Sequence, residues 1–132
     1  MSHLAAFDAA FAKCSLIAIL RGVKPDEVEA IGDTLVDAGF TLIEVPLNSP
    51  DPIESIGRLA TRVGDRAMVG AGTVLREAEV TAVAAVGGTL IISPNANPAV
   101  ITASAARGLV SLPGIATPTE AFAAVEAGAS RL

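Results

Sequence analysis

Short runs of Ile, Val and Leu recur along the chain and predict buried β-strands. Each run is nearly continuous in apolar residues, as is typical of parallel strands that are covered on both faces. The runs lie at Ser15–Leu20, Thr41–Val45, Ala67–Val69, Thr89–Ile92 and Leu109–Leu112, and a sixth begins near Ser130. The pattern therefore predicts an α/β protein with a parallel sheet.

The segments between these runs carry helix signals. Pro25-Asp26-Glu27 joins a proline suited to a first helical turn with acids that favour a helix N-terminus. Glycines at Gly39, Gly87, Gly108 and Gly128 are placed to end helices just before the next apolar run. A strand–helix unit thus repeats about every twenty to twenty-five residues. Such a repeat forms either an open doubly wound sheet or a closed barrel.

A closed barrel of this type has eight strand–helix units and about 250 residues. The 132 residues provide five units and the start of a sixth. If the fold is a barrel, we expect residues 1–132 to be one domain that is incomplete at its C-terminal end. The last residues, Ala129–Leu132, agree with this expectation because they begin another buried strand.

Composition and charge narrow the possible functions. Hydrophobic residues make up 52% of the chain, and 9 basic against 14 acidic residues give a net charge of −5. Trp and Tyr are absent and basic residues do not cluster, which argues against a nucleic-acid partner. No apolar run approaches the ~18 residues that span a bilayer, so no membrane contact is expected. The single cysteine, Cys14, excludes an intrachain disulfide and suits a cytoplasmic protein.

Metal and dinucleotide chemistry lack support in the sequence. The only histidine, His3, lies in the N-terminal tail, so no metal site is predicted. The segment Gly70–Leu75 has two glycines in the spacing of a dinucleotide motif, but a leucine stands where the third glycine belongs. These glycines allow a ligand to approach the backbone closely. We expect no bound cofactor.

Glu44 is the strongest catalytic candidate, because it lies within an apolar strand. Burial of a carboxyl group raises its pKa towards the range that suits a general acid/base. The alternative is a structural ion pair with Arg21, which follows the first strand. We favour catalysis, since carboxyl groups with shifted pKa values cluster at functional sites.

Other polar residues follow the strands, at the edge where parallel α/β folds place their sites. Asn48 either binds a ligand or forms a turn before Ser49-Pro50. Thr73 offers a hydroxyl at the end of the third strand, or belongs to a tight turn near the next helix. Pro94 and Asn95 follow the fourth strand, where proline makes a rigid wall and the amide can donate or accept hydrogen bonds.

Five motifs carry a family resemblance that extends from about Leu16 to Leu132. They are IAILRG, DAGFTLIEVPLNSP, VGAGTVL, ISPN and PGIATPTEA, in this order. Together they resemble the bacterial class I aldolases that act on 2-keto-3-deoxy-6-phospho sugar acids. The resemblance implies a (β/α)8 TIM barrel and a homotrimer. It also implies reversible cleavage of a phosphorylated keto sugar acid to pyruvate and glyceraldehyde 3-phosphate, without a metal.

The same resemblance implies roles for individual residues. Glu44 matches the general acid/base, and Thr73 matches the residue that hydrogen-bonds the pyruvate-derived carboxylate. Pro94 lines that pocket, and Arg21 matches an arginine that contacts the substrate. The phosphogluconate branch commonly reads E-V-T-L-R-T, whereas this chain reads E-V-P-L-N-S and has Asn48 in place of the arginine. This departure resembles the phosphogalactonate branch and implies 2-dehydro-3-deoxy-6-phospho-D-galactonate as substrate, with the gluconate epimer as the alternative.

The family's Schiff-base lysine is expected directly after Leu132. The chain contains only Lys13 and Lys24, and neither matches a catalytic position. A break at a covalently modified lysine and a shortened polypeptide both explain this pattern, and the sequence leaves the choice open. A non-catalytic domain of the same fold that binds a small molecule is the rival function.

Overall fold

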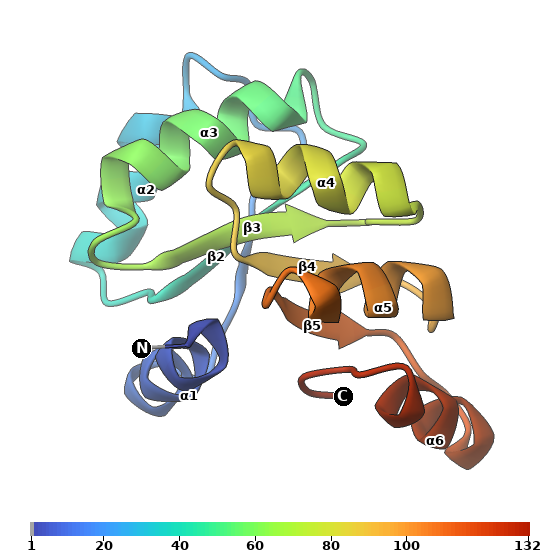
Figure 1. Ribbon diagram of the computed structural model, residues 1–132. Helices are drawn as coiled ribbons and strands as arrows, with labels where there is room; N and C mark the ends of the chain where they lie inside the picture. Colours follow the sequence, from blue (N-terminus) through green and yellow to red (C-terminus); the bar gives the residue numbers. More distant parts are fainter. Residues whose placement is uncertain (1) are drawn as a thin grey trace.

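The computed structural model describes residues 2–132, whose strands form one parallel sheet (Figure 1). The strands are β1 (Ala18–Ile19), β2 (Leu42–Pro46), β3 (Met68–Gly72), β4 (Leu90–Ser93) and β5 (Val110–Pro113). Each strand pairs with the next one in the chain, so their order across the sheet is β1-β2-β3-β4-β5. All five predicted strands are present. However, β1 has only two residues, and β3 continues through Gly72, three residues beyond the predicted run Ala67–Val69.

Helices precede the first strand and follow each of the five strands. They are α1 (His3–Lys13), α2 (Val28–Asp37), α3 (Pro52–Val63), α4 (Glu77–Ala85), α5 (Pro98–Ala106) and α6 (Pro118–Glu126). The four predicted glycine stops are confirmed, because Gly39, Gly87, Gly108 and Gly128 all have positive φ angles. The predicted start of α2 was three residues early, since Pro25–Glu27 forms a turn before the helix.

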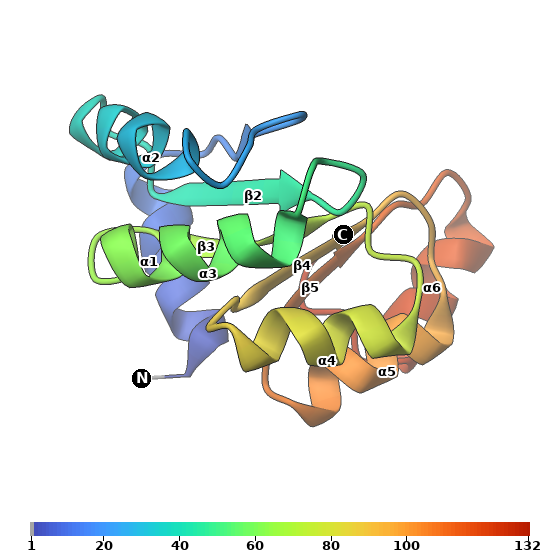
Figure 2. The ribbon, with the colours of Figure 1, turned by 90° about the horizontal axis from the view of Figure 1, so that it is seen from above.

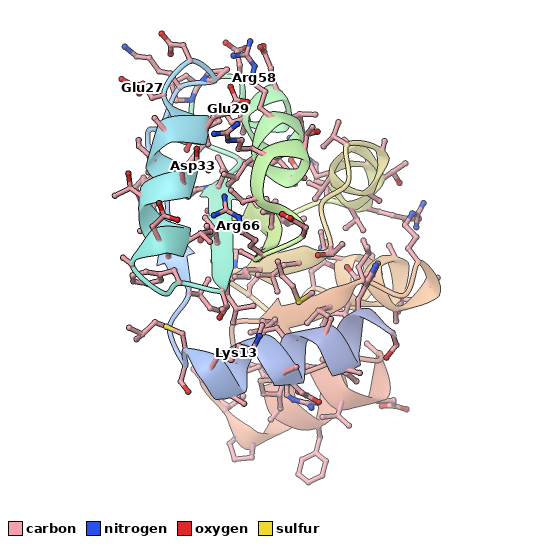
Figure 3. The ribbon with its side chains drawn as sticks, turned by 90° about the vertical axis from the view of Figure 1, so that its left-hand side faces the viewer. Lys13, Glu27, Glu29, Asp33, Arg58 and Arg66 are labelled. Atoms are coloured by element: carbon pink, nitrogen blue, oxygen red, sulfur yellow. The ribbon has the colours of Figure 1, made fainter. Side chains whose placement is uncertain are left out.

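The two faces of the sheet are covered by different helices. Figure 2 shows α3 and α4 outside the sheet, where Ile43, Val45 and Val69 contribute to the main hydrophobic core. On the other side, Phe7 of α1 packs against the first residues of three strands. Those residues are Leu42, Leu90 and Val110. Figure 3 views the molecule from this end, with α1 in front. Helix α1 therefore covers the amino-terminal end of the sheet and leaves the opposite edge to the loops.

The strand order decides between the two folds that the repeat allowed. A doubly wound sheet reverses its strand order at a switch point, whereas here every strand adds to the same edge. A sequential parallel order with the following helices outside is the arrangement of a (β/α) barrel. Residues 2–132 form five strands of such a barrel, as the resemblance implied. No helix within this range is long and apolar enough to cross a membrane.

Candidate active site

Glu44 is a buried carboxyl group in the middle of β2, and only 4% of its surface is exposed. Within residues 2–132, its Oε2 atom has no hydrogen-bond partner. Burial raises the pKa of Glu44 to about 7. The positive charge of Arg21 and the backbone of Gly72 act in the opposite direction and lower this pKa. A carboxyl group with this pKa can accept and return a proton near neutral pH.

Gly72 on the neighbouring strand provides the space that the Glu44 carboxyl occupies. A Cβ atom at position 72 would overlap both carboxyl oxygens of Glu44. In the β2–β3 register, Glu44 pairs with Gly70 and Pro46 pairs with Gly72. At Gly72 the protein's own carboxyl fills the space that a side chain would need, and the expectation that this glycine run lets a ligand approach the backbone stays a prediction.

Arg21 and Asn48 meet where β1 and β2 end. The Arg21 Nη1 atom donates to Asn48 Oδ1 at 3.5 Å, and the Gly22 N–H donates to the buried Ser49 hydroxyl at 3.0 Å. Among the residues that the structure describes, Glu44 Oε2 has no hydrogen-bond partner, and Arg21 forms no salt bridge with this carboxyl group. The alternative of a structural ion pair between Glu44 and Arg21 is therefore not supported within residues 2–132. The sequence did not reveal the Arg21–Asn48 contact, because it joins residues 27 positions apart.

Thr73 follows β3 in an unusual backbone conformation. Its φ angle of 58° lies in the left-handed region, which is costly for a residue with a side chain. Helix α4 begins at Glu77 and its N-cap is Arg76, so Thr73 is not a capping residue. Strained residues of this kind gather at functional sites, and their surroundings must hold them in place.

Pro94 and Asn95 are exposed in the loop after β4. Gly114, after β5, lies against this loop, and its N–H donates to the Ser93 carbonyl at 2.8 Å. The structure thus places Arg21, Asn48, Thr73, Pro94 and Asn95 on consecutive loops at one edge of the sheet. The Glu44 carboxyl lies beside Gly72, the last residue of β3, just below that edge. The side chain of Asn95 forms none of the hydrogen bonds within residues 2–132.

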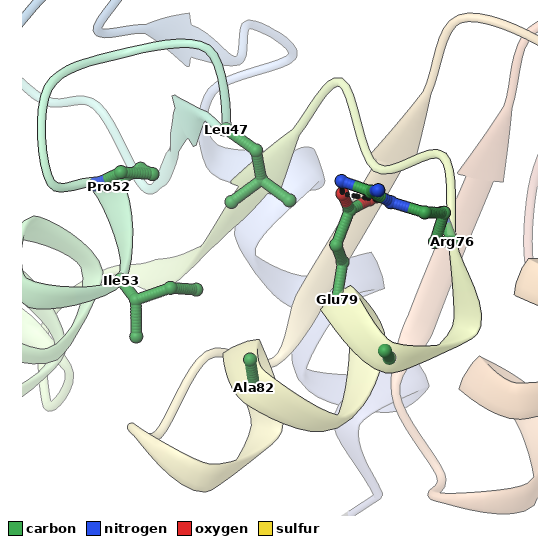
Figure 4. Close-up of a pocket in the computed structure, with 7 residues that line it drawn as sticks. Leu47, Pro52, Ile53, Arg76, Glu79 and Ala82 are labelled. Atoms are coloured by element: carbon green, nitrogen blue, oxygen red, sulfur yellow. Dashed lines mark hydrogen bonds and ion pairs between the residues drawn. The ribbon is translucent and has the colours of Figure 1, made fainter.

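A cavity of about 370 Å³ opens on the outer side of this edge (Figure 4). Its lining is mostly apolar and consists of Leu47, Pro52, Ile53, Arg76, Ala78, Glu79 and Ala82. None of the predicted site residues lines it. Arg76 and Glu79 form an ion pair of 2.8 Å at its rim, which sequence reasoning missed. The spacing of a helix-start residue and a glutamate three positions later was the available signal.

Both lysines are exposed on the surface. Lys13 ends α1 and lines a surface hollow with Thr41 and Met68, at the amino-terminal end of the sheet (Figure 3). Lys24 is exposed in the segment that leads to α2. Within residues 2–132, no three His, Cys, Asp or Glu side chains are grouped so that they could hold a metal ion.

A parallel (β/α) barrel with a buried carboxyl beside the carboxyl ends of its strands has the layout of a barrel enzyme. The sequence profile of the KDPG and KHG aldolase family matches residues 7–132. The chain belongs to this family.

Three relatives show how far the similarity extends. The chain is 54% identical over 117 residues to the "Probable 2-dehydro-3-deoxy-6-phosphogalactonate aldolase" of Rhizobium meliloti (strain 1021), covering 89% of this chain and 55% of the relative. It is 48% identical over 120 residues to the 2-dehydro-3-deoxy-6-phosphogalactonate aldolase of Escherichia coli (strain K12), covering 91% and 58%. The solved "Native KDPGal structure" is 49% identical, with a TM-score of 0.86 and coverage of 89% and 57%. The chain therefore spans little more than half the length of these relatives.

Proposed function

We propose that the protein containing this chain is a metal-independent class I aldolase. Its proposed substrate is 2-dehydro-3-deoxy-6-phospho-D-galactonate, which it cleaves to pyruvate and glyceraldehyde 3-phosphate. The observation that carries the proposal is Glu44, a buried carboxyl with a free Oε2 atom and a pKa of about 7. Family membership and the names of the two curated relatives support the reaction and the substrate.

Glu44 is the proposed proton carrier of the reaction. A lysine amine attacks the C2 carbonyl of the substrate, and the carbinolamine loses water to form a protonated imine. Glu44 then takes the proton of the C4 hydroxyl as the C3–C4 bond breaks, and the bonding electrons move into the imine to give an enamine. Return of the proton to C3 yields the imine of pyruvate, which water hydrolyses. Each step needs a group that is readily protonated and deprotonated near neutral pH.

The loops at the carboxyl edge are proposed to bind the substrate. The Thr73 hydroxyl would donate to the pyruvate-derived carboxylate, beside a wall formed by Pro94. Arg21 and Asn48, which already contact one another, would share recognition of the hydroxyl and anionic groups further along the substrate. Asn95 would contribute a further amide from the β4 loop.

The imine-forming amine is proposed to come from outside residues 1–132. Imine formation requires an uncharged amine, and desolvation in a barrel interior favours that form of lysine. Lys13 lies at the opposite end of the sheet and Lys24 is exposed. We propose a lysine next to Leu132 in a single barrel domain, and we propose that the protein is a cytoplasmic homotrimer. Light scattering of the complete protein would determine its oligomeric state.

Borohydride trapping tests the central proposal. The complete protein, treated with pyruvate and borohydride, should gain a covalent adduct whether or not a metal chelator is present. The variants Lys13→Arg and Lys24→Arg should form the adduct as the wild type does. An adduct that maps to either of these lysines, or that disappears with chelator, would contradict the mechanism. Cleavage of the galactonate and gluconate epimers, followed by pyruvate release, tests the substrate separately.

A further inference from the structure

The loop that carries Thr73 is fixed at each following residue. Val74 is fully buried, and its N–H donates to the Ile92 carbonyl at 3.1 Å. The N–H groups of Leu75 and Arg76 both donate to one oxygen of Glu79, at 2.8 and 3.0 Å. The other oxygen of Glu79 accepts two hydrogen bonds from the Arg76 guanidinium, at 3.0 and 2.8 Å. Although burial acts to raise it, these bonds hold the pKa of Glu79 below its ordinary value.

Asn97 ties the same loop to the loop after β4. Its Nδ2 group donates to the Leu75 carbonyl at 3.2 Å, and its Oδ1 atom accepts from the Ala99 N–H at 3.0 Å as the N-cap of α5. One amide thus joins the Thr73 loop to the segment that follows Pro94. Leu75 is held at its N–H by Glu79 and at its carbonyl by Asn97.

These contacts bear on the strain at Thr73. A left-handed conformation at a threonine persists only where the neighbouring structure enforces it. The Thr73 hydroxyl forms none of the hydrogen bonds within residues 2–132, so its own side chain does not hold the conformation. Its neighbours are held on both sides: the Gly72 carbonyl accepts from the Leu47 N–H at 2.9 Å, and residues 74–76 are held by the contacts described above.

We propose that Glu79 and Asn97 are positioning residues, which hold Thr73 in its left-handed conformation so that its hydroxyl can bind the carboxylate of pyruvate. The identity of the ligand rests on the proposed function. The claim that these two residues fix the backbone conformation of Thr73 does not depend on that function. Neither residue touches the reacting atoms. Both act through the backbone of residues 74–76.

The chain contains a matched control for Glu79. Glu120 accepts from the N–H groups of Ala116 and Thr117, both at 2.8 Å, in the same arrangement at the start of α6. It holds the loop after β5, which does not carry Thr73. Glu79→Ala and Glu120→Ala therefore remove the same kind of helix-start contact, and only the first releases the Thr73 loop.

Asn97→Asp separates the two roles of Asn97. A carboxylate oxygen can still accept from the Ala99 N–H and cap α5, but it cannot donate to the Leu75 carbonyl. In the complete protein, Asn97→Asp and Glu79→Ala should each raise the KM for pyruvate about tenfold, with little change in kcat. This is the effect expected when about one hydrogen bond to the bound ligand is lost. The exchange of pyruvate methyl protons with heavy water provides both constants.

Two further measurements decide the inference. Glu120→Ala should keep the wild-type KM, and Asn97→Asp should add little to the KM of Thr73→Ala, because both act on one contact. An unchanged KM in Asn97→Asp and Glu79→Ala, or an equal rise in Glu120→Ala, would overturn the proposal. A crystal structure of Asn97→Asp should show Thr73 outside the left-handed region. If the wild-type protein exchanges no pyruvate protons, the proposed function fails. In that case the crystal structure still tests the positioning role, and a Thr73 φ angle near its present value in Asn97→Asp would overturn it as well.

Discussion

Gly72→Ala is expected to displace the Glu44 carboxyl while it leaves the sheet intact. The added Cβ atom would overlap the two oxygens and Cδ of Glu44, which are the far end of a flexible side chain. Glu44 can therefore rotate away, and the Gly72 backbone does not have the positive φ that would exclude alanine. We expect a stability loss of about 1 kcal/mol, at the lower end of overpacking effects.

Activity should respond far more strongly than stability. A general acid/base that leaves its position forfeits about 10²- to 10⁴-fold in rate. Exchange of pyruvate methyl protons with heavy water, followed by NMR on the complete protein, measures this loss. Adding Gly72→Ala to Glu44→Gln should cause little further decrease, because both changes remove the same group.

Gly70→Ala is the matched comparison on the same strand. Its Cβ atom would meet the backbone carbonyl of Leu90, which cannot rotate away. The pairing of β3 with β4 must then open, and we expect a loss of about 3 kcal/mol or more in stability. Urea unfolding should therefore show that Gly70→Ala is the less stable of the two variants, although only Gly72→Ala displaces the Glu44 carboxyl. Wild-type exchange and stability in Gly72→Ala would refute the assignment of Glu44 as the base.

Four other predictions concern charge and pH. Glu44→Gln should slow proton exchange about 10²- to 10⁴-fold and abolish the inflection near pH 7 in the wild-type rate; an unaltered rate would identify another base. Because the pKa of Glu44 is raised from 4.5 to about 7, its contribution to stability is present below pH 4.5 and lost by about pH 7. The stability of wild type relative to Glu44→Gln should therefore fall by roughly 3 kcal/mol over this range in denaturant titrations, and a constant difference would argue against burial. Asn48→Arg should shift cleavage towards the gluconate epimer, as competition between the two epimers would show, and an unchanged ratio would remove Asn48 from the specificity argument. Hydrogen bonds from Arg62, and then Arg66, hold the pKa of Asp33 below its ordinary value of 3.8. The stability that Asp33 provides should therefore be lost as the pH falls below about 4. Acid unfolding of Asp33→Asn should show a weaker dependence in that range, and the same dependence as wild type would contradict it.

The sequence by itself determined the elements and the class of chemistry. Continuous Ile, Val and Leu runs predicted the five strands, and glycines predicted four helix ends, because both signals depend on neighbours along the chain. Glu44 stood out for a similar reason, since one carboxyl within an apolar strand is visible without a structure. The family motifs gave the expected barrel and the proposed aldolase reaction.

Tertiary structure decided how these parts meet. The sequential strand order separated a barrel from a doubly wound sheet, and the β2–β3 register placed Gly72 beside Glu44. Arg21 was a possible partner of Glu44 by charge, but its guanidinium contacts Asn48 instead. Such contacts depend on the register of paired strands and on side-chain rotamers across long sequence separations, and no local pattern encodes them. For the same physical reason, the hydrogen bond from Asn97 to the Thr73 loop, 22 residues apart in sequence, became visible only in three dimensions.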